Sequence, residues 1–197
     1  MNERLASVLL GLSFIAAGVR ALVGMPGLSA SAVGAVLSLL VGGLFVGRGP
    51  IQKAGSTRAA VVALPSLLLG SLALQLAGTA PLSASPVAAV VLAFGLALAV
   101  WSLLTLGRNF AIFPALRSVV TGGPFRRLRH PTYAGQLLIV VGCLGVAGLG
   151  FVEVAILVGA TLWLAARISV EEALLRVSPE YRGYMDRVRW RLVPGIW

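Results

Sequence analysis

Residues 86–106 read PVAAVVLAFGLALAVWSLLTL, with no ionisable side chain among them. A helix that crosses a bilayer needs about 20 mostly apolar residues, so this stretch predicts a transmembrane helix. Apolar stretches before and after it predict further spans at 5–23, 32–46, 59–77, 133–149 and 152–177. We therefore expect an all-α fold, a polytopic helical membrane protein with about six transmembrane helices. Five spans are the alternative, if the last hairpin does not fully cross.

The composition excludes an ordinary soluble domain. Hydrophobic residues make up 58% of the 197 residues and charged residues 11%, whereas soluble domains average about 25% charged residues. A soluble domain of this size would leave too much apolar surface in water. The first apolar run, 5–23, resembles a signal peptide in its charged start, but it is long enough to span, and we expect it to be a transmembrane helix.

The basic residues predict the orientation. The net charge is +10, and nothing in the pattern resembles a nucleic-acid site, since no aromatic platform or basic amphipathic helix accompanies the arginines. Positive residues mark cytoplasmic loops, and six spans with both termini in the cytoplasm leave Arg20 alone on the outer side. The other basic residues fall inside: Arg4, Arg48, Lys53, Arg58, Arg108, Arg117, Arg126, Arg127, Arg129, Arg167, Arg176, Arg182, Arg187, Arg189 and Arg191.

The chain divides into two regions. Residues 1–106 are nearly pure spans, rich in Gly and Ala, which let helices approach closely in lipid, and we expect them to form a scaffold. Residues 107–197 hold the single histidine, all three tyrosines and most of the arginines, so the candidate site lies there. No cluster of metal-ligating residues is expected. The single cysteine, Cys143, excludes an intramolecular disulfide and is interpreted as a small packing residue.

Arg129, His130 and Pro131 form the first candidate patch. Proline suits the first turn of a helix, so a helix is predicted to begin at Pro131, with Tyr133 near its mouth. A helix N-terminus presents free N–H groups and the positive end of the dipole, which suits a carboxylate or phosphate. The alternative is a basic loop at the membrane interface with an aromatic anchor.

One further patch lies in the last turns of the last predicted span, and another follows that span. Glu171 and Glu172 are adjacent at its emerging end; Glu171 is placed to pair with Arg167 one turn earlier, and Glu172 then points about 100° away, toward a neighbouring element. A short helix is predicted from Pro179, capped by Ser178, with Tyr181, Tyr184 and Val188 on one face. The alternatives are a solvated helix end and an interfacial amphipathic helix.

Together these patches resemble the isoprenylcysteine carboxyl methyltransferase family and the related phospholipid methyltransferases. The matching stretches run in the family's order over residues 106–194: Leu106-Gly107-Arg108-Asn109-Phe110, Gly123-Pro124-Phe125-Arg126, Arg129-His130-Pro131-Thr132-Tyr133-Ala134-Gly135, Glu171-Glu172 with Leu174-Leu175, and Tyr181-Arg182-Gly183-Tyr184 with Pro194. One departure is Val177-Ser178-Pro179, where the family has Phe-Gly.

The resemblance implies an integral membrane methyltransferase that uses S-adenosylmethionine and acts on a lipophilic acceptor from the bilayer, an isoprenylcysteine-type carboxylate or another isoprenoid or lipid. Arg187 matches a basic position facing the acceptor's carboxylate, and His130 is the candidate base for an acceptor that must lose a proton. The implied cofactor-binding residues are Gly123, Pro124, Arg129, His130, Tyr133, Glu171, Glu172, Tyr181 and Tyr184.

Two other functions stay open at this stage. Membrane reductases of the sterol-reductase type share the C-terminal architecture and use NADPH, and a non-enzymatic membrane scaffold would also fit the spans. The preference for Arg over Lys and the richness in Ala, Gly, Val and Leu indicate a GC-rich bacterial genome. We therefore expect the protein in a bacterial inner membrane with its site on the cytoplasmic face.

Overall fold

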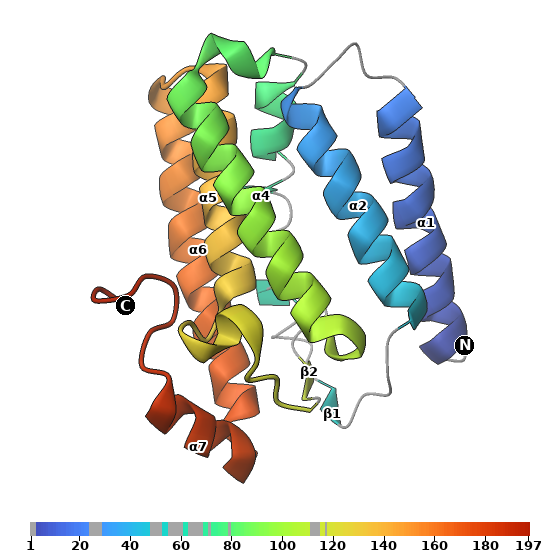
Figure 1. Ribbon diagram of the computed structural model, residues 1–197, viewed down its shortest axis with the longest axis vertical. Helices are drawn as coiled ribbons and strands as arrows, with labels where there is room; N and C mark the ends of the chain where they lie inside the picture. Colours follow the sequence, from blue (N-terminus) through green and yellow to red (C-terminus); the bar gives the residue numbers. More distant parts are fainter. Residues whose placement is uncertain are drawn as a thin grey trace.

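The computed structural model is a bundle of long helices (Figure 1) and describes residues 3–23, 29–47, 53–54, 61–62, 69–70, 72–78, 80–110, 115–116 and 118–197. The predicted all-α class is confirmed. The helices are α1 (Glu3–Val23), α2 (Ala30–Gly47), α4 (Pro86–Leu106), α5 (Pro131–Ala147), α6 (Phe151–Leu175) and α7 (Pro179–Arg187). Short 3-10 turns lie at η1 (Leu82–Ala84), η2 (Gly107–Asn109) and η3 (Gly123–Arg126), and β1 (Lys53–Ala54) pairs antiparallel with β2 (Ala115–Leu116).

The predicted spans correspond closely to these helices. Within the described ranges, three stretches are long and apolar enough to cross a membrane, at Ala30–Gly47, Pro86–Asn109 and Phe151–Leu175, and two shorter apolar helices lie at Ser7–Val23 and Pro131–Ala147. The span predicted at 59–77 falls partly outside the described residues; within it, 61–62, 69–70 and 72–77 are helical. The choice between five and six spans, like the cytoplasmic placement of the termini, stays a prediction.

Glycines set how closely the helices pair. In α5, a Cβ on Gly135 would lie 2.7 Å from the backbone nitrogen of Ala99 in α4, and one on Gly142 would lie 2.7 Å from the backbone nitrogen of Leu92. Because the obstructing atoms are backbone, these positions cannot take a larger residue without moving a helix. Gly11 and Gly42 bring α1 and α2 together in the same way. Small residues favour such close packing in lipid, so α1–α2 and α4–α5 form two tight pairs.

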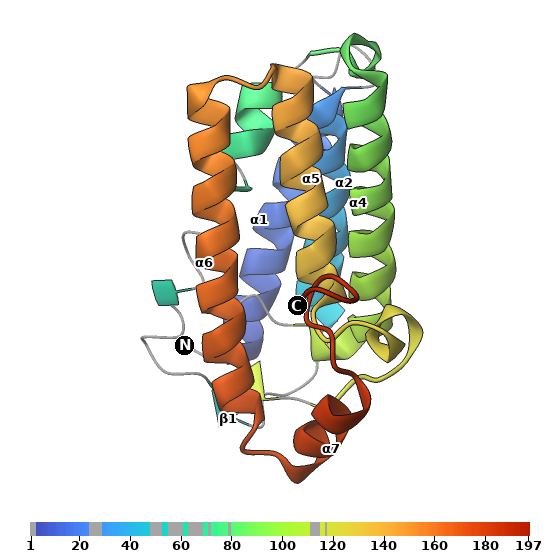
Figure 2. The ribbon, with the colours of Figure 1, turned by 90° about the vertical axis from the view of Figure 1, so that its left-hand side faces the viewer.

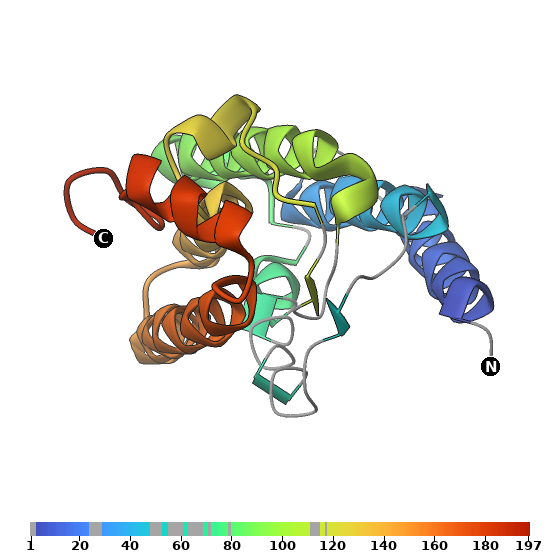
Figure 3. The ribbon, with the colours of Figure 1, turned by 90° about the horizontal axis from the view of Figure 1, so that it is seen from below.

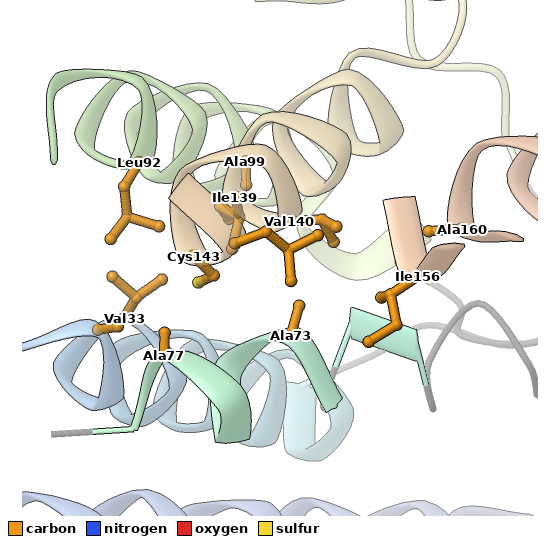
Figure 4. Packing of buried hydrophobic residues seen from close by; sticks show 12 residues of the cluster. Val33, Ala73, Ala77, Leu92, Ala99, Ile139, Val140, Cys143, Ile156 and Ala160 are labelled. Atoms are coloured by element: carbon orange, nitrogen blue, oxygen red, sulfur yellow. The ribbon is translucent and has the colours of Figure 1, made fainter. Parts of the chain in front are cut away.

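The main apolar core lies where α2, α4, α5, α6 and the helical residues 72–77 meet (Figure 4). Leu92, Ile139 and Val140 are its larger members, and Ala73, Ala77 and Ala99 fill the narrower gaps. Cys143 is completely buried in this cluster, which confirms its predicted role as a small packing residue.

One end of the bundle gathers the polar elements. The first residues of α1 and α5 and the last residues of α2, α4 and α6 lie at the lower end of the view in Figure 1, where α7 continues from α6 (Figures 1 and 2). Seen from below, α7 lies beside the end of α6 (Figure 3). The motifs predicted from the sequence therefore meet at this end.

Candidate functional site

The loop before α5 is built by the Gly123-Pro124 turn. Gly123 has a φ of +53°, and a Cβ there would lie 2.9 Å from Thr105 Oγ1 at the end of α4. Glycine is therefore required both by its backbone conformation and by the close approach. The 3-10 turn η3 begins at Gly123, Pro124 is its second residue, and Pro124 and Phe125 are buried. The turn thus packs against α4 and fixes where the following residues enter α5.

Helix α7 packs its aromatic face against this loop, and Tyr181, Tyr184 and Val188 share that face, as predicted. Tyr181, Tyr184 and Val188 form a buried cluster with Phe125. The Tyr184 hydroxyl donates to the carbonyls of Phe125 (2.8 Å) and Leu128 (3.1 Å). Pro179 starts the helix after Ser178, also as predicted, although the Ser178 side chain makes no capping hydrogen bond. These aromatic side chains face protein rather than a membrane surface, in contrast to the interfacial-helix alternative.

Glu172 is the charged centre of the site. Its side chain is 1% exposed, and its carboxylate meets side chains from three elements. Oε1 lies 3.1 Å from Arg129 Nε and 3.2 Å from His130 Nε2. Arg191 donates to Oε2 from Nη2 at 2.9 Å and from Nε at 3.2 Å, and Arg176, half exposed, lies at 3.4 Å. The prediction that Glu172 points toward a neighbouring element is confirmed.

Glu171 faces the other way, into a second cluster. It accepts a hydrogen bond from the Tyr133 hydroxyl. The Tyr133 ring stacks on the His130 imidazole, with 5.5 Å between ring centroids and 7° between planes. The Arg167 guanidinium lies 4.8 Å from the Tyr133 ring centroid, close enough for a cation–π contact. Glu172 thus holds the His130 ring directly at Nε2, and Glu171 holds it indirectly, through the stacked Tyr133 ring.

A cavity of about 370 Å³ opens from these side chains into the bundle. Its polar end is lined by Asn109, Ser118, Arg129, His130, Thr132, Tyr133, Gln136, Arg167, Glu171, Tyr181 and Tyr184. The rest is largely apolar and lies between the two helix pairs, with Phe14, Gly34, Leu37, Ser38, Val41, Gly70, Leu74, Ala99, Leu103, Leu106, Phe110, Ile139 and Val140 among its walls. The N-terminal helices therefore supply the apolar wall of the same cavity that the C-terminal motifs enclose.

The structure brings most of the predicted residues together, but in two groups. Arg129, His130, Tyr133, Glu171, Tyr181 and Tyr184 line the cavity. The remaining four, Gly123, Pro124, Glu172 and Arg187, are not among its lining residues. Gly123 and Pro124 shape the loop, and Glu172 lies behind Arg129 and His130. Arg187 is exposed at the end of α7, so its role toward the acceptor stays a prediction.

Two arginines and a threonine that lie at the site were not among the predicted site residues, although Arg167 was predicted to pair with Glu171. Arg191 is the strongest partner of Glu172 by distance, yet its place in a basic tail gave no indication of this. Arg167 is 3% exposed and lines the cavity; a buried arginine within an apolar span is the pattern that marks functional sites in membranes. The Thr132 hydroxyl lies beside His130 in the cavity wall and has no hydrogen-bond partner among the described residues.

The environment of α7 and the tail changes several pKa values. Burial, together with the charges of Glu172 and Glu171, raises the pKa of Tyr181 well above its usual value, and burial raises that of Tyr184. Hydrogen bonds to Glu172 raise the pKa of Arg191. The Tyr181 hydroxyl is buried, and the described residues offer it no hydrogen-bond partner. A protonated phenol facing a cavity is thus available to a ligand.

Comparison with known proteins agrees with the motifs. The phospholipid methyltransferase family model matches residues 84–178. The fold is similar to that of the eukaryotic intramembrane Ras methyltransferase ICMT, an isoprenylcysteine carboxyl methyltransferase, with 19% sequence identity and a TM-score of 0.52 over 97% of this chain and 73% of that one. No curated protein matches the sequence. The predicted resemblance is confirmed, and these findings support a membrane methyltransferase.

Proposed function

From the resemblance of this chain to the isoprenylcysteine carboxyl methyltransferase and phospholipid methyltransferase families, we propose that it uses S-adenosylmethionine to methylate a lipophilic acceptor. The observation that carries the proposal is the cavity with a charged, aromatic end and an apolar arm. The polar end takes the water-soluble cofactor and the arm takes the acceptor's hydrocarbon chain. We place the site on the cytoplasmic face of a bacterial inner membrane, where the cofactor is available.

The chemistry of the cavity-lining groups fits this cofactor. Its carboxylate would be held by Arg129, and by His130 when both ring nitrogens carry a proton, since cationic groups suit an anion. Its cationic amine and sulfonium would be held by Glu171 and by the face of Tyr181, since aromatic faces and carboxylates attract cations. Tyr133 would hold Glu171 in place through its hydroxyl. The hydroxyls of Thr132 and Tyr181, which have no hydrogen-bond partner among the described residues, would bond to its ribose or base. Gly123, Pro124, Glu172 and Tyr184 would support these groups from behind or beside them.

When bound, this cofactor supplies a methyl group on a positively charged sulfur. The protein's part is to bring the acceptor atom in line with that methyl group in a site that excludes water. The tight α4–α5 pair and the η3 turn fix His130 and Tyr133 on one wall. Helix α7 covers the opposite side with Tyr181 and Tyr184. The reacting groups are thus enclosed by protein at the end of the bundle.

The protonation state of the acceptor decides what His130 does. A carboxylate acceptor is ionised at neutral pH and needs no base. An amine, phenol or thiol would need to lose a proton, and His130 is the single histidine. Because His130 Nε2 faces the Glu172 carboxylate at 3.2 Å, Nε2 carries a proton and donates. In neutral His130 the lone pair is then on Nδ1, which would take the acceptor's proton.

Ligand titration tests the cofactor. Detergent-solubilised protein is titrated by calorimetry with S-adenosylmethionine, S-adenosylhomocysteine and NADPH. We expect the first two to bind at one site and NADPH not to bind. Binding of NADPH alone would support a reductase and overturn the proposal, and binding of none of the three would support a non-enzymatic scaffold. Lipid extracts incubated with protein and methyl-labelled cofactor then identify the acceptor by mass.

A second experiment tests the apolar arm. Gly34 of α2 lines the arm, and a Cβ there would lie 3.6 Å from Leu74, an ordinary van der Waals contact, so a larger side chain at this position would extend into the cavity. Gly34→Leu is expected to raise the KM for the acceptor by about 10-fold or more, the scale on which apolar pockets discriminate by size, with the cofactor Kd unchanged. Gly43→Leu on the same helix, where a Cβ meets nothing within 4 Å, is the matched control. Equal effects of the two substitutions would contradict an acceptor in the arm.

A further inference from the structure

We infer that Arg191 and the C-terminal tail are positioning elements of the site: through Glu172 they set the side chains of Arg129 and His130 that face the cavity. The inference rests on the proposed function for its meaning but on separate contacts for its support. Arg191 is not among the residues that line the cavity, and neither is Glu172. Both therefore act through other side chains.

The contacts of Glu172 divide between its two oxygens. Oε1 faces Arg129 and His130, the two cavity-lining partners. Oε2 faces Arg191, at 2.9 Å from Nη2, and the more distant Arg176. Arg191 Nε lies 3.2 Å from both oxygens, so the guanidinium fork fixes the rotation of the carboxylate. If the fork is removed, the carboxylate can rotate, and Oε1 no longer has a fixed position toward His130.

The tail also holds the backbone of the same two residues. The N–H of Arg129 donates to the Trp190 carbonyl at 2.8 Å, and the N–H of His130 donates to the Arg191 carbonyl at 3.0 Å. Leu192, 7% exposed, packs with Ala134, Leu164 and Ile168 from α5 and α6. The tail is thus bonded to the 128–130 loop and anchored by its apolar side chain.

The tail closes on itself around Arg191. The backbone N–H groups of Arg191, Leu192 and Val193 all point at the Trp197 carbonyl oxygen, at 2.9, 3.0 and 3.2 Å. The Arg191 guanidinium lies 5.1 Å from the centroid of the Trp197 ring. The turn therefore holds Arg191 at its backbone N–H and at its guanidinium. Arg191 and its neighbours in the tail are thus held by the bonds to Glu172, by backbone bonds to Arg129 and His130, by the packing of Leu192 and by the turn at Trp197. Together these contacts fix the orientation of Arg129 and His130.

Two measurements test the inference on Arg191→Ala, with Arg191→Lys as the milder change and Arg189→Ala as the control. Arg189 is an exposed neighbour in the same tail. We expect the Kd for S-adenosylmethionine to rise by about 10- to 100-fold in Arg191→Ala, by analogy with the residues that orient the ligands of metal sites. Arg191→Lys keeps the charge without the guanidinium fork, and its Kd for S-adenosylmethionine is expected to lie between those of wild type and Arg191→Ala. Calorimetric stoichiometry gives the folded, binding-competent fraction, so Kd refers to folded protein alone.

The second measurement needs no cofactor. His130 is the only histidine, so protein labelled with nitrogen-15 histidine and purified without a polyhistidine tag gives one imidazole signal pair. We expect the His130 signals to shift in Arg191→Ala and to be unchanged in Arg189→Ala. Unchanged signals, or an unchanged Kd, in Arg191→Ala would overturn the inference. Wild-type protein that fails to bind S-adenosylmethionine would overturn the proposed function, and the imidazole signals would still decide the role of Arg191.

Discussion

Replacing Glu172 by glutamine removes one negative charge from the centre of a cationic cluster and keeps the shape of the side chain. Glu172 is 1% exposed, and the side chains of Arg129 and Arg191 around it are 9% and 24% exposed. Deleting one partner of a buried ion pair costs about 3–5 kcal/mol because the remaining charge is left without compensation. Here at least two arginines would lose their counter-charge together.

We therefore expect Glu172→Gln to lower the free energy of unfolding by about 3–5 kcal/mol. For a chain of this size, 1 kcal/mol corresponds to about 2–4 °C in Tm, so the detergent-solubilised variant would melt roughly 6–20 °C below wild type. The assay is a thermal melt followed by intrinsic tryptophan fluorescence, with circular dichroism at low temperature to establish that the variant is helical before heating.

Glu171→Gln is the matched control, because it makes the same chemical change one residue away. Glu171 is partly exposed in the cavity wall and accepts a hydrogen bond from Tyr133, which a glutamine oxygen also accepts. We expect its Tm to change by less than about 4 °C, within the range of substitutions away from buried charges. Its cofactor Kd is expected to rise, because it loses the charge that faces the cavity. Equal melting temperatures for Glu172→Gln and wild type would refute the role assigned to Glu172.

Three further outcomes follow from the contacts of single residues. Tyr181→Phe removes a hydroxyl that has no partner among the described residues, so the Tm is expected to stay within a few degrees of wild type. The cofactor Kd is expected to rise about 2- to 12-fold, which corresponds to one hydrogen bond. An unchanged Kd by calorimetry would contradict a contact between this hydroxyl and the ligand. Because burial raises the pKa of Tyr181 and Tyr184, the folded state favours protonated phenols. The stability contributed by these residues is therefore full below pH about 10 and declines as the pH rises above it. Thermal melts between pH 9 and 11 should show a shallower decline of Tm in Tyr181→Phe than in wild type, and parallel curves would count against this assignment. Gly142→Ala places a Cβ 2.7 Å from the Leu92 backbone and is expected to cost about 1–3 kcal/mol, whereas Gly43→Ala, facing open space, is expected to be close to neutral by the same melt.

Much of the fold could be predicted because lipid imposes a simple rule on sequence. Backbone groups in the membrane must be bonded within a helix, so apolar runs of sufficient length give helices directly, as at 86–106. The starts of two helices were also predictable from single residues, because Pro131 and Pro179 begin α5 and α7, where their missing N–H is tolerated. The span predicted at 59–77 has no proline at its start, and part of it lies outside the described residues.

Only those features of the candidate site that depend on residues close together in the sequence could be predicted. The sequence alone determined the helix starts, the gathering of polar residues in 107–197 and the opposite directions of Glu171 and Glu172, because helical geometry fixes the angle between neighbours. Only the tertiary structure decided that Arg191 reaches Glu172, and that Phe14, Gly34 and Leu74 share a cavity with His130. The physical reason is that these contacts depend on how the C-terminal tail turns back and on how closely glycines let the helices within each pair approach. The periodicity of the sequence contains no information on either.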